Sequence, residues 1–125
     1  MPLYNIATRR ELSPRLRTAV AQVVLDTHCE ITEAPPAFVN VVFPQGYPLR
    51  SGVELSMIGS VREGGNRDAA LLARLERELR TRIAHAAGVP PAAVEVTLMG
   101  VPASWVMEGG RIMPEPGEEQ DWLQH

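Results

Sequence analysis

The chain has 125 residues, of which 45% are hydrophobic, and it carries a formal net charge of -3. This length suits one ordinary domain with a real core, and the mixed charges provide neither a basic field for nucleic acid nor a polybasic patch for a membrane. No apolar run reaches the roughly 18 residues that span a bilayer, and the first residues lack the layout of a secretory signal, so we expect a cytoplasmic protein.

Cysteine and histidine usage limits the cofactor chemistry. Cys29 is the only cysteine, so no internal disulfide can form, and the three histidines do not have the spacing of a metal site. We therefore expect no metal and no cofactor.

The first half of the chain predicts a strand, a helix and a second strand. A strand is expected over residues 2–8, and Ser13 followed by Pro14 is a typical helix start. Apolar residues then recur at helical spacing until about residue 33, ahead of a Pro-Pro pair. A returning strand is expected over residues 38–43, and a loop with glycine and proline over residues 45–52.

The second half repeats this order. Residues 34–41 read APPAFVNV and residues 89–96 read VPPAAVEV, an offset of 55 from Pro35 to Pro90. A strand is predicted over residues 54–61, a glycine-rich loop follows, and a helix with an apolar leucine stripe ends at Gly88. The last long strand is expected over residues 94–101.

Two tandem β-α-β units follow from this pattern, so the predicted fold class is α/β. The pseudo-repeats cover about residues 2–45 and 54–101 of a single domain spanning residues 1–125. Right-handed crossovers place both helices on one face of a four-stranded sheet. Residues 38–43 are apolar on both sides, so we expect the other face to meet further subunits in a closed oligomer. The tail, residues 102–125, carries two tryptophans and is expected to dock.

Four residues could carry chemistry on sequence grounds. Removal of Met1 would give Pro2 a free secondary amine, a rigid base whose pKa burial or a neighbouring cation lowers towards neutrality, whereas a retained Met1 leaves a tertiary amide without basicity. Arg62 precedes a glycine loop and a helix start, which suits an acidic ligand. His28 lies at the edge of the first helix's apolar stripe, and Glu108 lies in a loop after the last strand.

Together these residues resemble the tautomerase superfamily, in particular the cis-3-chloroacrylic acid dehalogenase group. The resemblance covers nearly the whole chain and is carried by residues 1–4, 26–28, 62–65 and, most specifically, 101–119 with Trp122. It implies a fold like that of macrophage migration inhibitory factor, assembled as a trimer. It also implies a catalytic N-terminal proline, two arginines that hold the substrate carboxylate, and a His, a Tyr and a Glu around the substrate.

Carried over residue by residue, the resemblance assigns catalysis to Pro2, His28 and Glu108, and carboxylate binding to Arg62. Two positions depart from the family pattern. Gly65 stands where the second arginine is expected, with Arg67 two residues further on, and Thr97 stands at the tyrosine position without a phenol.

These departures favour one activity over its relatives. Keto-enol tautomerisation needs a base and an anchored carboxylate, which Pro2 and Arg62 could supply with help from Arg67. The leading hypothesis is a tautomerase acting on small 2-oxo or 2-hydroxy-enoic acids. Dehalogenase or hydratase chemistry on an unsaturated three-carbon acid is the second hypothesis, and an inactive carboxylate-binding oligomer is the third.

Overall fold

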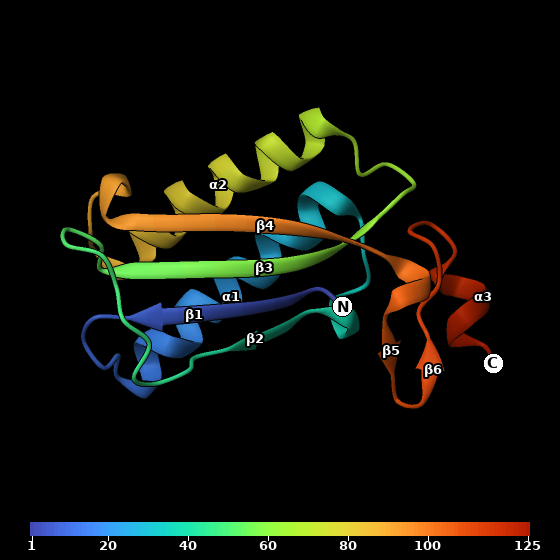
Figure 1. Cartoon of the computed structure of the whole chain (residues 1–125), viewed down its shortest axis with the longest axis horizontal. Coiled ribbons are helices and arrows are strands. Elements are labelled where there is room, and N and C mark those ends of the chain that lie inside the picture. The colour runs from blue at the N-terminus through green and yellow to red at the C-terminus, as the bar shows by residue number, and fades with distance from the viewer.

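The computed structural model describes residues 1–125 and contains one main sheet backed by two long helices (Figure 1). Its elements are β1 (Leu3–Thr8), α1 (Pro14–Thr32), β2 (Asn40–Val42), β3 (Leu55–Glu63), α2 (Ala69–Ala87) and β4 (Val94–Pro102). The strand order is β2-β1-β3-β4, with β2 parallel to β1, β4 parallel to β3, and the central β1–β3 pair antiparallel. The predicted tandem β-α-β fold is confirmed.

Local capping defines both helices. The Ser13 side chain accepts a hydrogen bond from the Leu16 N–H at 3.2 Å, and Pro14 occupies the first turn of α1. The Asp68 carboxylate accepts from the Leu71 N–H at 2.8 Å at the start of α2. Gly88 ends α2 with φ 71°, in the left-handed region that glycine adopts without strain.

The main core lies between the sheet and the helices. Tyr4 and Ile6 point from β1 towards α1 and α2, and their alternate neighbours point to the other face. The other fully buried large side chains of this layer are Val20, Val24, Met57, Val61, Leu75, Leu79 and Ile83. No helix is long and apolar enough to cross a membrane.

The two Pro-Pro segments form equivalent turns. Pro36–Phe38 and Pro91–Ala93 are both single 3-10 turns, each with a proline as the preceding residue. The predicted returning strand over residues 38–43 is therefore too long at both ends, because Phe38 lies in the turn and β2 covers only Asn40–Val42. β2 is an edge strand with partly exposed residues in the single chain, so burial of its apolar residues on both faces would need the neighbouring subunits that the sequence analysis expects.

The tail lies at the end of the sheet where the chain's N-terminus is, beside the start of β1 and the end of β4 (Figure 1). It comprises a 3-10 turn (Ala103–Trp105), the hairpin strands β5 (Met107–Glu108) and β6 (Arg111–Ile112), and the short helix α3 (Glu119–Leu123). Trp122 docks as expected, edge to face with Phe38 at 5.5 Å between ring centres. Trp105, by contrast, is 79% exposed.

Candidate active site

The N-terminus meets the tail at one end of the sheet. The Met1 amine forms an ion pair with the Glu108 carboxylate, which lies in β5 and not in the flexible loop that the sequence predicted. A cavity of ≈ 440 Å³ opens here, lined by Met1, Leu3, Asn40, Val42, Ser60, Val106, Met107 and Glu108. Burial lowers the pKa of the terminal amine, Glu108 opposes this effect, and the charge of Arg62 adds to it.

Pro2 is buried directly beside this amine. Its carbonyl oxygen accepts a hydrogen bond from the Asn40 backbone N–H at 3.0 Å, which ties the chain start to β2. Met1, Phe38 and Met113 form a second small apolar cluster, against which Trp122 packs. The first residues are therefore held firmly at the position where the tail crosses the sheet.

Arg62 lies at the end of β3, close enough for its charge to act on both the terminal amine and His28. It is only 2% exposed, and its guanidinium is already engaged by the tail. One N–H donates to the Pro114 carbonyl at 2.6 Å and another to the Glu119 carboxylate at 3.0 Å, while the cation lies 5.2 Å from the centre of the Phe38 ring.

Glu119 is a site residue that the sequence interpretation missed. Burial by itself raises the pKa of its carboxyl, but hydrogen bonds from the Gly117 N–H and from Arg62 outweigh burial, so the pKa lies below its usual value. No local pattern links residues 57 positions apart, and the acidic character of residues 118–121 resembles an ordinary solvated helix start.

Arg67 approaches the same region from the loop before α2. One of its N–H groups donates to the Thr32 carbonyl at 3.2 Å, a second contacts the Asn66 side chain, and its buried Nε has no protein partner. Burial and the charge of Arg62 lower the pKa of this guanidinium. Arg67 thus contributes a partly buried positive charge that no carboxylate pairs with.

The tail explains why Gly65 stands where an arginine was expected. Gly65 has φ +58°, and a Cβ atom there would lie 2.7 Å from the Pro116 carbonyl oxygen. The space next to the glycine loop is therefore filled by Pro116, which leaves no room for a side chain at position 65.

His28 lies on the buried face of α1 and is 1% exposed. Its Nδ1 is 2.6 Å from the Tyr4 hydroxyl, and its Nε2 has no protein partner. Burial, followed by the charges of Arg67 and Arg62, lowers the pKa of His28 to about 3, so its ring is neutral at physiological pH. Tyr4 was part of the sequence resemblance, but no role was assigned to it.

Thr97 lies apart from these residues in the single chain. It is exposed on the uncovered face of the sheet, paired across the strands with Ile58, and it lines none of the cavities described here. Glu108 therefore contacts the chain terminus, and the charges of Arg67, Arg62 and the terminus all act on His28, whereas Thr97 takes part in neither set.

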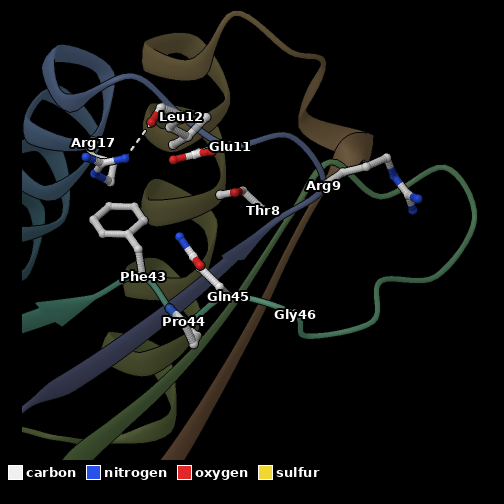
Figure 2. A pocket seen from close by; sticks show the side chains of 9 residues that line it. All are labelled: Thr8, Arg9, Glu11, Leu12, Arg17, Phe43, Pro44, Gln45 and Gly46. Carbon is white, nitrogen blue, oxygen red and sulfur yellow. Dashed lines mark hydrogen bonds between the residues drawn. The ribbon is translucent and has the colours of Figure 1, made fainter.

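Another cavity lies at the opposite end of the sheet, where β1 ends (Figure 2). It has a volume of ≈ 480 Å³ and is lined by Thr8, Arg9, Glu11, Leu12, Arg17, Phe43, Pro44, Gln45 and Gly46. The Arg17 guanidinium donates to the Leu12 carbonyl, and Arg9 points away from the hollow towards the neighbouring loop, where it donates to the carbonyls of Val53 and Arg50. No residue predicted for catalysis lines it.

Comparison with known proteins identifies structural neighbours. A crystal structure of a member of the cis-3-chloroacrylic acid dehalogenase family superimposes with a TM-score of 0.86 and 27% sequence identity, covering 98% of this chain and 90% of that chain. A wild-type fused 4-OT, described as an asymmetric trimer, gives 0.75 with 16% identity over 88% and 94% of the two chains. Macrophage migration inhibitory factor of Toxoplasma gondii gives 0.71 with 17% identity over 87% and 97%. No protein-family model and no curated protein sequence matches the chain.

Proposed function

We propose that this chain, whose structure is similar to that of a cis-3-chloroacrylic acid dehalogenase family member, is a tautomerase acting on small 2-oxo or 2-hydroxy-enoic acids. The observation that carries this proposal is the ion pair between the chain start and Glu108, beside the positive charge of Arg62, which acts on both the terminal amine and His28. A proton carrier and an anion-binding charge are what keto-enol transfer of a carboxylic acid requires.

Pro2 moves the proton in this proposal. Cleavage of Met1 converts its nitrogen from a tertiary amide into a secondary amine, in the same buried surroundings that lower the pKa of the Met1 amine. A base whose pKa lies near the working pH transfers protons in both directions most effectively. Glu108, which contacts the chain terminus, orients the substrate oxygen or the amine.

Arg62 and Arg67 together attract the substrate carboxylate. Arg62 shares its charge with Glu119, so the net positive charge of the region comes mainly from Arg67, which has no ion-pair partner. A partly buried guanidinium next to another cation is stabilised when an anion arrives. In this proposal Arg67 therefore binds the substrate carboxylate together with Arg62, in place of an arginine at position 65.

Oligomerisation through the uncovered sheet face completes the proposal. Leu3, Val42 and Met99 are exposed on that face at 38%, 43% and 47%, and Trp105 and Met107 of the tail are more exposed still. The cavity beside Met1 opens on the same face, so a subunit packed there would border the site. We propose a homotrimer, the assembly described for one fused 4-OT neighbour. Light scattering coupled to size exclusion measures this directly.

Enolpyruvate ketonisation by the untagged protein tests the proposed reaction, after intact mass spectrometry has established that Met1 is absent. Pro2→Ala should reduce kcat on the order of 100-fold, the share that a positioned general base contributes. Pro48→Ala, in the exposed loop before β3, is the matched control and should keep full activity.

The same assay panel separates the alternatives. The dehalogenase or hydratase activity would be favoured if halide release from 3-haloacrylates, or hydration of propiolate-like acids, is faster than ketonisation. No activity in any of the three assays would support the third hypothesis, an inactive carboxylate-binding oligomer.

Arg67→Gln tests the anion-binding charge. Loss of one charge-assisted contact should raise KM on the order of tenfold with a smaller effect on kcat. Arg74→Gln, which removes an exposed charge from α2, is the control. Equal KM values in the two variants would contradict the role given to Arg67.

A further inference from the structure

The Tyr4–His28 pair is the most deeply buried polar contact near the candidate site. Tyr4 is 0% exposed and His28 is 1% exposed, and their rings meet edge to face with 5.6 Å between centres. The Tyr4 hydroxyl and the His28 Nδ1 are 2.6 Å apart. The pair joins β1, two residues after Pro2, to the last third of α1.

The available hydrogen-bond partners indicate which ring nitrogen of His28 carries the proton. If the Tyr4 hydroxyl donates to Nδ1, the only group left without a protein partner is an Nε2–H. If Nδ1–H donates to Tyr4 instead, both the phenol hydrogen and the Nε2 lone pair lack partners. Because unpaired buried polar groups are costly, the first arrangement is favoured.

The charges around the pair support the same arrangement. Burial raises the pKa of the Tyr4 phenol far above its usual range, so Tyr4 remains a hydroxyl that can donate. Burial, and then the charges of Arg67, Arg62 and the chain terminus, disfavour a second proton on His28, and α1 places no carboxylate in hydrogen-bond contact with its ring.

The backbone makes room for this arrangement. Gly59 of β3 is the cross-strand partner of Tyr4, and a Cβ at position 59 would lie 2.4 Å from the Tyr4 ring. The Tyr4 ring therefore packs against the Gly59 backbone, in space that a Cβ atom would fill, and from there its hydroxyl reaches His28 of α1. Nothing comparable surrounds Tyr47, the other tyrosine, which is 52% exposed in a loop.

We propose that Tyr4 is a positioning residue that holds His28 as the Nε2–H tautomer, so that His28 donates a hydrogen bond to a substrate oxygen and does not act as a base. This inference rests on the proposed tautomerase reaction, in which the substrate oxygen carries enolate charge while the proton moves between that oxygen and carbon. The buried Nε2–H has no protein partner, and by donating to that oxygen it would stabilise the enolate. It also removes His28 as an activator of water, which disfavours hydration.

Nitrogen-15 spectra of the side chain test the tautomer without reference to activity. The wild-type protein should show a pyrrole-type Nε2 and a pyridine-type Nδ1 for His28 from about pH 5 to pH 8. Tyr4→Phe, which keeps the ring over Gly59, should shift His28 towards a mixture of tautomers, and Tyr47→Phe should not. A pyridine-type Nε2 in the wild-type protein would overturn the inference, whatever Pro2→Ala does to the rate.

Kinetics test the donor role. Tyr4→Phe should lower kcat on the order of tenfold with little change in KM, because one preorganised donor is weakened. If Tyr4→Phe does not fold, variants of His28 test the donor role instead. His28→Gln retains an N–H donor, so its kcat should exceed that of His28→Leu at least about tenfold. Equal rates for the Gln and Leu variants, with Pro2→Ala inactive, would refute the donor role while leaving the proposed function intact.

Discussion

Replacing Glu119 by Gln removes the carboxylate that pairs with the buried Arg62 guanidinium. Removing one partner of a buried ion pair costs about 3–5 kcal/mol, because the remaining charge keeps its desolvation penalty. Gln retains an oxygen that can accept from Arg62, so we expect the lower end, about 3 kcal/mol. For a chain of this size that loss lowers Tm by about 12 °C, at roughly 4 °C per kcal/mol.

Urea and thermal unfolding at one fixed protein concentration measure this effect. Glu118→Gln is the matched control, since it makes the same charge change at the neighbouring exposed position. Arg62→Met combined with Glu119→Gln should recover part of the loss, because the uncompensated charge is gone. A Glu119→Gln variant within about 0.5 kcal/mol of Glu118→Gln would refute the reasoning.

The pH dependence gives a second readout of the same pair. The folded pKa of Glu119 lies below its ordinary value of 4.5, so the stabilisation is present above that value and is lost as pH falls through the folded pKa. The wild-type and Glu119→Gln stabilities should therefore converge in acid. A constant difference down to strongly acidic pH would contradict the assigned ionisation.

Three further changes follow from the structure. Gly65→Ala should destabilise the fold by at least about 1 kcal/mol more than Gly46→Ala, since both residues have positive φ but only position 65 meets Pro116; equal losses in urea unfolding would show that the tail yields. The folded pKa of His28 is about 3 against 6.5 for an unperturbed histidine, so below pH 6.5 the unfolded state takes up the proton first. Stability should then fall by up to about 1.4 kcal/mol per pH unit towards pH 3, and His28→Gln should lack this component. Ser13→Ala should cost about 1 kcal/mol through loss of the α1 cap, and a loss below about 0.3 kcal/mol would argue against that cap.

The order and type of the main elements could be predicted because their signals are local. Ser13 before Pro14 and Gly88 after a leucine stripe act through hydrogen bonds within one turn, so neighbouring residues suffice to place the helix ends. The Pro-Pro segments predicted turns for the same reason. The error at Phe38 arose because a β-branched run following a turn does not reveal where the turn stops.

Long-range partners could not be read from the sequence. Arg62 is paired with Glu119, and only the docked tail brings them together. Both residues of the Tyr4–His28 contact are buried, and alternation along a strand and the apolar stripe of a helix are local signals for such burial. What no periodicity could show is that their polar atoms meet, since this depends on the register between sheet and helix.

Met1 is 8% exposed and packs with Phe38 and Met113, so the initiator residue occupies a place of its own in the folded protein. If a peptidase removes Met1, as the proposed function requires, the cleavage would uncover the Pro2 nitrogen and also empty the space next to it that the methionine side chain fills. In the proposed reaction, the size of that emptied space would favour short unbranched acids over bulky ones.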